Sequence, residues 1–451
     1  MREGEAGHNV LLGGETVDTL RSQAVSAKLQ QIAQQAVRYP DLVFMTLMHL
    51  IDVDFLWEAY RRTRKSGAPG VDGVTAKEYA VDLEANLLDL HERMRSGRYK
   101  APPVERVWID KEDGKKRPIG KPTFEDKIVQ RSVAMLLGAV YEQDFYDFSH
   151  GFRPNRNAHQ ALQLLKEQCV KMKVGWIVDA DVSGFFDNLD HGLLREILQR
   201  RVNDGGVTRF IGKWLNAGVL EDGALKHTDK GTPQGGVISP MLSNIFLHHV
   251  LDDWFVKVVK PRLKGKCFLI RFADDFVVGC TLEEDARWVL AALKERFERF
   301  KLAIHPEKTR LVRFRRPSPQ TENGSGNGTF DFLGFSHYWS RSRQGYWVIK
   351  RKTAKKRLRR TMKSLWQWCR LNRHEQLKAQ YSLLCSKLRG HYQYYGVRFN
   401  YPMLDRVFDH VKIAWRFWLK RRCHKDNTTW DKFNRLQLIF PLPRPRIVHN
   451  I

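Results

Sequence analysis

The sequence predicts an α+β fold, because a chain of 451 residues combines short apolar strands, two of them joined by a tight turn, with amphipathic helices and a helical C-terminal third. The segment WIVDADV at 176–182 is a short apolar run interrupted by acids, and FLIRFADDFVVG at 268–279 has the pattern of two strands joined by a tight acidic turn. The segment 283–300 that follows has the periodicity of an amphipathic helix. Hydrophobic residues make up 42% of the chain, which excludes a protein that is disordered throughout.

The length of 451 residues suggests about three domains, and the remaining elements follow in order. The first residues predict a helical extension over 1–43 whose pattern is only weakly defined. A Gly/Pro loop at 66–73 separates two helical stretches, and an alternating strand at 104–109 precedes a turn-rich stretch at 110–118. The clearest loop is 316–329, rich in Pro, Gly, Ser and Asn, and a short strand pair and a basic helical C-terminal third come after it.

The chain carries a large positive charge that is concentrated in its C-terminal third. The net charge is +27, and the segment from Lys350 to Arg422 holds 21 Lys and Arg residues but only three acids. A solvated basic helix is one interpretation. Nucleic-acid binding is favoured over it, because this helix has an apolar stripe by which it can dock, and aromatic residues on which bases can stack are interleaved with the cations. The stripe consists of Leu358, Met362, Leu365, Trp366 and Cys369.

The absence of several well-known motifs argues against some common classes of enzyme. There is no Walker A motif, G-x-G-x-x-G, H-E-x-x-H or G-x-S-x-G, which argues against kinase, dehydrogenase, metalloprotease and hydrolase functions. The six cysteines form no C-x-x-C pair, so we expect neither a zinc site nor a disulfide framework, and a reducing, intracellular compartment. No uncharged apolar run reaches the ~18 residues of a membrane span, and the N-terminus lacks a signal-peptide pattern.

Two acidic segments predict a site for divalent cations. Asp274 and Asp275 are adjacent acids between apolar strands, and Asp179 and Asp181 share one face of a strand because side chains alternate with a period of two. An ordinary hairpin turn is an alternative explanation of the first pair, since Asp favours turns. Carboxylates are, however, hard oxygen ligands suited to Mg²⁺, and unpaired carboxylates on a buried face are costly unless a cation joins them. Together the segments are compatible with a two-metal site for phosphoryl transfer.

The order of eight short segments resembles the reverse transcriptases, or maturases, that bacterial group II introns encode. The resemblance runs from about Phe44 to the C-terminus, where RGHYQYYG and PLPRPRIVHNI resemble the maturase region of that family. Eight segments in the family's order are far more specific than any one of them. They are APGVDG, KEDGKKRPIGKPTFEDKIVQR, GFRPNRNAHQAL, DADVSGFFDNLDH, GTPQGGVISPMLSNIFL, RFADD, HPEKT and FLGF.

The resemblance implies a right-hand polymerase with fingers, palm and thumb, in which the C-terminal thumb or maturase region is mostly helical and basic. The implied domains are an N-terminal extension at 1–43, fingers with part of the palm at 44–175, a palm at 176–345 and a thumb or maturase region at 346–451.

The resemblance also assigns roles to individual residues. Asp181, Asp274 and Asp275 match the catalytic aspartates, which would hold two Mg²⁺ ions, with Mn²⁺ as a substitute, whereas Asp179 is expected to be structural. Phe186 matches the ring that rejects a 2′-hydroxyl, and Phe185 is the less favoured alternative. The other residues that match nucleotide contacts are Lys111, Arg117, Gln234 and Lys308. The residues that we expect to contact RNA are Arg153, Arg156, Lys355, Lys356, Arg359, Arg360 and His391.

The expected function is therefore an RNA-directed DNA polymerase that also assists the splicing of a group II intron. Its expected partners are the intron RNA, an RNA template with a DNA primer, target DNA and dNTPs, and its expected location is the bacterial cytoplasm at the nucleoid, with no membrane. Phe272 replaces the family's usual tyrosine before the two aspartates, a change expected to leave metal binding intact. Two alternatives stay open: a domesticated relative that polymerises for another purpose such as phage defence, and an RNA-binding splicing cofactor with an idle palm.

Overall fold

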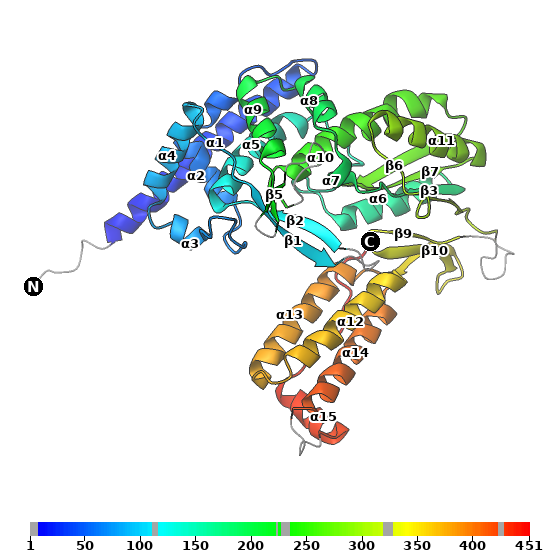
Figure 1. The fold of residues 1–451 in the computed structure, drawn as a ribbon. Coiled ribbons are helices and arrows are strands. Elements are labelled where there is room, and N and C mark those ends of the chain that lie inside the picture. The colour runs from blue at the N-terminus through cyan, green and yellow to red at the C-terminus, as the bar shows by residue number, and fades with distance from the viewer. Residues whose placement is uncertain (1–7, 111–115, 222–223, 227–234, 319–327, 423–427) are drawn as a thin grey trace, which may run out of the picture.

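The computed structural model describes residues 8–110, 116–221, 224–226, 235–318, 328–422 and 428–451. Figure 1 shows three parts: helices with a small sheet, a larger sheet flanked by helices, and a helical bundle that projects from the rest. The first two parts share one large hydrophobic core, and the bundle has a core of its own.

The N-terminal part is a layer of helices around α5 (Phe124–Tyr141), most of whose apolar side chains are buried. α1 (His8–Arg38) packs against α2 (Val53–Arg62) and α5, and Val25 and Ile32 of α1 are buried in the shared core. The extension expected at the N-terminus is therefore helical over its described residues, and it packs against the helices that follow. The other helices of this part are the 3₁₀ turn Met48–Leu50, α3 (Ala76–Tyr79), α4 (Leu83–Arg95), α8 (His191–Gln199) and α9 (Gly205–Asn216).

The small sheet joins two distant segments of the chain in the order β2-β1-β4-β5. β1 pairs antiparallel with β2 and parallel with β4. The strand expected at 104–109 is confirmed as β1, but the expected turn-rich stretch is shorter than 110–118, because β2 already begins at Lys116. The bounds are β1 (Val104–Asp110), β2 (Lys116–Lys121), β4 (Val219–Glu221) and β5 (Ala224–Lys226).

The central sheet has the order β6-β7-β3-β8, and all its neighbouring strands are antiparallel. The two strands expected at 268–279 are confirmed as β6 and β7. Side chains alternate between the faces, so that Ile177 and Val277 pack on the side of α6, whereas Val178 and Phe276 pack on the side of α11. The bounds are β3 (Trp176–Ala180), β6 (Cys267–Phe272), β7 (Asp275–Cys280), β8 (Arg310–Arg313), α6 (Ala158–Lys171), α7 (Phe185–Asn188), α10 (Ser239–Leu247) and α11 (Glu283–Arg299).

A three-stranded sheet, in the order β11-β10-β9, leads directly into the helical bundle. The palm–thumb boundary expected at residue 345 falls inside the β10–β11 hairpin, and the change to helices comes after Thr353. Only Ala354 separates β11 from α12. Asn400 fastens this junction, because its Oδ1 accepts a hydrogen bond from Thr353 N at 2.7 Å and its Nδ2 donates to the Tyr395 carbonyl at 2.8 Å. The bounds are β9 (Phe330–Phe332), β10 (Phe335–Arg341), β11 (Trp347–Thr353), α12 (Lys355–Leu371), α13 (Leu377–Tyr395), α14 (Tyr401–Leu419) and α15 (Trp430–Ile439).

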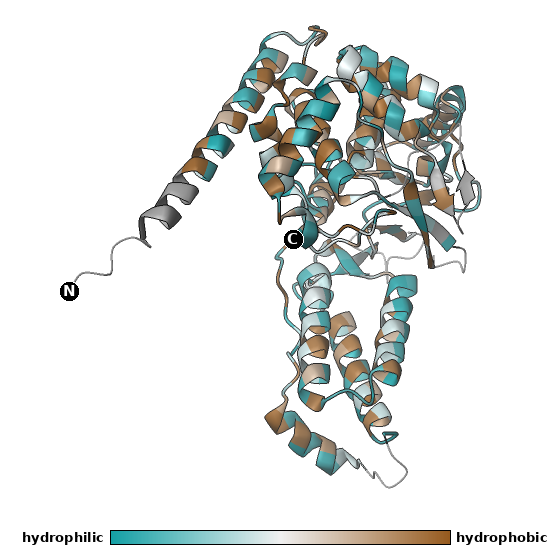
Figure 2. Cartoon of the chain, turned by 60° about the vertical axis from the view of Figure 1, so that its left-hand side comes forward, coloured by the Kyte–Doolittle hydropathy of each residue, from teal (hydrophilic) through white to brown (hydrophobic). Residues whose placement is uncertain are grey.

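The helices of the bundle are amphipathic, and each carries both hydrophobic and hydrophilic residues (Figure 2). The apolar stripe expected on α12 is confirmed as its docking face: Leu358, Leu365 and Cys369 are buried together with Leu388 and Trp415 of neighbouring helices. Throughout the described ranges, no helix is both long enough and apolar enough to cross a membrane.

Candidate active site

The three candidate aspartates lie at the ends of neighbouring strands of the central sheet. β3 pairs antiparallel with β7, with Ala180 opposite Phe276. Continued by one residue, this register brings Asp181 beside Asp275. Asp274 precedes Asp275 in the two-residue turn between β6 and β7 and belongs to the same edge. The sheet therefore gathers all three acids at one edge.

The neighbouring acids raise the affinity of Asp275 for protons. Asp275 keeps contact with solvent at the start of its strand, but neighbouring protein atoms crowd its carboxylate. This loss of hydration, together with the negative charges of Asp274 and Asp181, raises the pKa of Asp275 to about 7, and the charge of Arg357 opposes the rise. A bound cation would stabilise a carboxylate in such surroundings.

A lysine already neutralises one of the three acids. Lys308 Nζ lies 2.9 Å from Asp181 Oδ2, and both side chains are partly exposed. Asp179, the last residue but one of β3, pairs with Arg310 at 2.9 Å. The donor set suits Mg²⁺, because carboxylate oxygens are its ligands in proteins and the Lys308 ammonium marks a cation position beside Asp181. Within the described part of the chain, no three His, Cys, Asp or Glu side chains converge closely enough to form a ready metal site.

The acidic turn is held against a second segment by close backbone packing. Ala273, the first residue of the turn, has a φ of +56°, in the left-handed region that is unfavourable for a residue with a side chain. A Cβ added at Gly151 would lie 2.2 Å from Ala273 N and 2.8 Å from the Phe272 carbonyl carbon. A β-bridge between Ser149 and Arg271 brings the two segments together. The contact therefore requires glycine at position 151.

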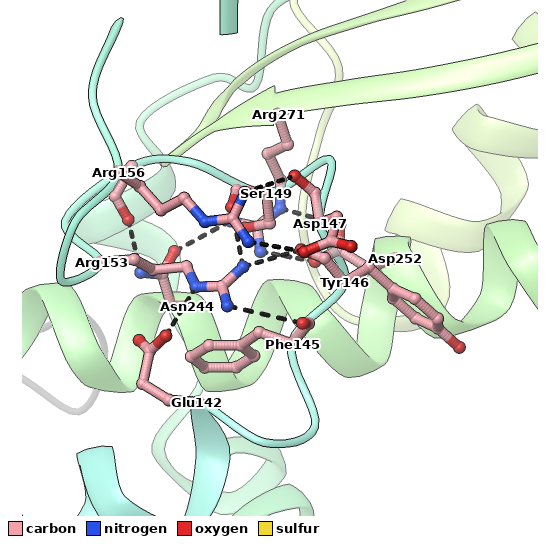
Figure 3. A network of polar contacts seen from close by, with 11 residues as sticks. Glu142, Phe145, Tyr146, Asp147, Ser149, Arg153, Arg156, Asn244, Asp252 and Arg271 are labelled. Atoms are coloured by element: carbon pink, nitrogen blue, oxygen red, sulfur yellow. Dashed lines mark hydrogen bonds and ion pairs between the residues drawn. The ribbon is translucent and has the colours of Figure 1, made fainter. Parts of the chain in front are cut away.

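A buried ion pair supports the same turn (Figure 3). Arg271 makes a bidentate pair with Asp252, with Nη2–Oδ2 at 2.5 Å and Nε–Oδ1 at 2.8 Å, and both side chains are fully buried. Arg271 Nη1 also donates to Asn244 Oδ1 at 2.9 Å and to the Ala273 carbonyl at 3.0 Å. Asn244 Nδ2 in turn donates to the Gly151 carbonyl at 2.8 Å. One network thus fixes both segments, and its only sequence signal is a charged residue inside an apolar strand.

Arg153 and Arg156, expected to contact RNA, lie in the loop beside this network (Figure 3). Arg153 is buried, its Nε donates to Glu142 Oε2 at 2.9 Å, and its Nη1 donates to loop carbonyls that include that of Tyr146 at 2.7 Å. Its guanidinium donates hydrogen bonds within the protein, so we no longer propose Arg153 as an RNA contact. Arg156 pairs with the exposed Asp147 at 2.5 Å and stays partly accessible.

The two phenylalanines that follow Asp181 occupy different environments. Phe185 is buried in the main core, whereas Phe186 is half-buried and packs edge-on against it, with the ring centroids 5.3 Å apart. Of the two, only Phe186 keeps part of its ring exposed to solvent.

The residues expected to contact the nucleotide are only partly described. Lys111 and Gln234 lie outside the described residues. Of Arg117 only the backbone is described, which pairs with Ile109 across the β1–β2 hairpin. Besides Phe186, Lys308 is the one whose side chain is described, and it contacts Asp181.

The helical bundle places one cation, Arg357, near the acidic edge. The positive charge of Arg357, an exposed residue in the first turn of α12, acts against the raised pKa of Asp275 and therefore lies close to the acids. The sequence analysis did not single out Arg357, because it is one of nine basic residues in 350–363. His391 of α13 packs against Tyr395 with the ring centroids 4.7 Å apart, and burial lowers its pKa to about 4. The four residues of α12 expected to bind RNA, Lys355, Lys356, Arg359 and Arg360, are all exposed.

The part of the chain that contains the acidic edge matches a known family. The model described as reverse transcriptase (RNA-dependent DNA polymerase) matches residues 109–337, which include Asp181, Asp274 and Asp275. The chain belongs to the reverse transcriptase family, and its fold is that of the right-hand polymerases.

Comparison with individual relatives indicates which kind of reverse transcriptase the chain is. The chain is 32% identical over 361 residues to the protein YkfC of Escherichia coli, a match that covers 71% of this chain and 90% of YkfC. It is 36% identical over 238 residues to the group II intron-encoded protein LtrA of Lactococcus lactis, which covers 52% of this chain and 39% of LtrA. A third match, 27% identical over 212 residues, is to nuclear intron maturase 1 of Arabidopsis thaliana, and it covers 42% of this chain and 28% of that protein. The chain is thus a reverse transcriptase of the group II intron and maturase type.

Proposed function

We propose that this chain extends a DNA primer on an RNA template with dNTPs and that it also binds group II intron RNA to promote splicing. The observation that carries the proposal is the gathering of Asp181, Asp274 and Asp275 at one edge of the central sheet. These residues would hold two Mg²⁺ ions, with Mn²⁺ as a substitute. Bound there, such ions supply activation of the primer 3′-hydroxyl and neutralisation of the leaving pyrophosphate.

The protein's own residues supply position and selectivity. The Gly151 contact and the Arg271 network keep the acidic turn in place. Phe186 offers a ring against which a 2′-hydroxyl would clash, and a bound triphosphate would give the Lys308 ammonium a second partner besides Asp181. The bundle takes the role of the thumb, and the exposed cations of α12 contact RNA phosphates.

Primer extension on an RNA template tests the catalytic part of the proposal. Asp274→Ala should reduce extension by at least ~100-fold, because it removes a carboxylate from the acidic edge, while circular dichroism stays unchanged. Asp82→Asn is the matched control, since Asp82 is exposed and its side chain makes no capping hydrogen bond. Extension by Asp274→Ala near the wild-type rate would contradict the assignment. Splicing by a wild-type protein that extends no primer would favour a splicing cofactor with an idle palm.

A further inference from the structure

A basic pocket lies at the end of the central sheet opposite to the acidic edge. It has a volume of about 750 Å³, and Trp176, the first residue of β3, and Arg313, the last residue of β8, line it. Asp181 follows the other end of β3, and at roughly 3.3 Å per residue the pocket is about 17 Å from it along the strand. The pocket is therefore separate from the candidate active site.

Among the described residues, the charge of this pocket is not balanced by carboxylates. Its cations are Lys173, Arg313, Arg315 and Arg316, all exposed. Its one acid, Glu283, is already paired with Arg287 one turn along α11, at 2.6 Å. Among the described residues, no carboxylate forms an ion pair with any of the four cations. The pocket is thus a concave surface with an excess of positive charge, which suits an anionic ligand.

Aromatic rings in the same pocket indicate which anion fits. Trp176 is partly exposed and is the cross-strand neighbour of Arg313 in the β3–β8 register. Trp339 is buried, and its Nε1 donates to the Phe314 carbonyl at 2.9 Å, which fixes the ring in the wall. A tryptophan face beside guanidinium groups is suited to an unpaired base and its phosphates.

We propose that this pocket binds a short stretch of single-stranded RNA outside the catalytic cleft, with one base against Trp176 and successive phosphates on Arg313, Arg315 and Arg316. Several arginines in sequence along one edge favour a chain of phosphates over a single phosphate group. The volume lies in the upper part of the range of about 300–1,000 Å³ for enclosed ligand sites, so the concave site suits a single strand better than a duplex. This site goes beyond the proposed polymerase and splicing functions.

Binding of a fluorescein-labelled 10-nucleotide oligouridylate to the full chain tests the phosphate contacts, with the catalytic cleft first saturated by an unlabelled primer–template duplex. Arg315→Gln with Arg316→Gln should raise the Kd and reduce the slope of log K against log salt by about 1.4, since each phosphate contact on a single strand contributes ~0.7. Lys260→Gln with Lys294→Gln is the matched control, because both lysines are exposed and neither lines the pocket. Equal effects in both double variants, or an unchanged slope in the first, would overturn the proposal.

Photocrosslinking of a 4-thiouridine oligonucleotide tests the base contact. The crosslinked peptide should contain Trp176, Trp176→Leu should lose the crosslink, and Trp176→Phe should retain it. UMP that competes as strongly as the 10-mer would show a mononucleotide site and overturn the proposal. Primer extension should be unchanged in all these variants, so that a failure here is distinguishable from a failure of the proposed polymerase function.

Discussion

Gly151 is pressed against the backbone of Ala273, because a Cβ at position 151 would lie 2.2 Å from the Ala273 nitrogen. Gly151→Ala must therefore displace either its own loop or the turn that carries Asp274. We expect single-nucleotide incorporation to fall by roughly 100-fold, the order of effect that a displacement of ~1 Å has on catalysis. Gly205→Ala is the control, since no atom lies within 4 Å of the added Cβ there. An equal loss in both variants would contradict a specific role for the Gly151 contact.

Replacing Phe186 tests the selection of the sugar. Phe186→Ala should raise the ratio of ribonucleotide to deoxyribonucleotide incorporation, because it removes the partly exposed ring. Phe185→Ala should leave the ratio unchanged and instead lower the free energy of unfolding by about 3–5 kcal/mol, because Phe185 is in the core. Competition between the two nucleotide types during primer extension, together with urea unfolding, measures both effects. A ratio that changes only in Phe185→Ala would show that the wrong ring was assigned.

Replacing the exposed cations of α12 should affect splicing more than DNA synthesis. Replacing Lys355, Lys356, Arg359 and Arg360 by Gln should weaken intron RNA binding and reduce the salt slope by up to about 3, because each phosphate contact on a single strand contributes ~0.7. Assisted splicing should fall more than extension on a short annealed template at low salt. Asp274→Ala should show the reverse pattern. If both activities fall together in both variants, the division of roles between sheet and bundle is wrong.

A buried histidine should make the stability of the fold depend on pH. His337 of β10 lies opposite Arg351 of β11, and burial, together with the Arg351 charge, lowers its pKa to about 3. The pKa in the unfolded chain is about 6.5, so the unfolded state takes up this proton first as the pH falls. The contribution of His337 to stability is complete above pH 6.5 and is lost toward pH 3, at up to ~1.4 kcal/mol per pH unit.

Urea unfolding at pH 7 and pH 5 measures this effect. His337→Phe should show a smaller loss of unfolding free energy between the two pH values than the wild type. His374→Gln is the control, because His374 is exposed, and it should retain the wild-type difference. Equal pH dependence of His337→Phe and the wild type would contradict the assignment.

The elements that the sequence predicted well are those set by neighbouring residues. Alternation located β1, short apolar runs beside acids located β3 and the β6–β7 hairpin, and the apolar stripe of α12 located its docking face, because all these patterns lie within a few residues. The same patterns misplaced the start of β2, because Lys116 and Arg117 lack the apolar signal of a strand and pair only through the hairpin.

The contacts that hold the candidate site join residues far apart in the chain, and local patterns do not encode them. Gly151 contacts Ala273 only in the folded protein, and the residues next to each in the sequence give no indication of this contact. Arg153 has the polar surroundings of a surface residue in the sequence, yet the fold supplies carbonyls and Glu142 to bury it. In the sequence, nothing distinguishes Arg357 from the other cations of the basic run. Its role follows from the fold, because the β10–β11 hairpin brings α12 toward the acids.

Because a single residue separates β11 from α12, the bundle is joined rigidly to the three-stranded sheet and is not attached by a flexible linker. A flexible linker would absorb a rotation of the bundle before it reached the sheet. Here Ala354 is buried, and Asn400 ties Thr353 at the end of the strand to Tyr395 at the end of the second bundle helix. A displacement of α12 would therefore move the β10–β11 hairpin with it, and it would change the distance between the Arg357 charge and Asp275.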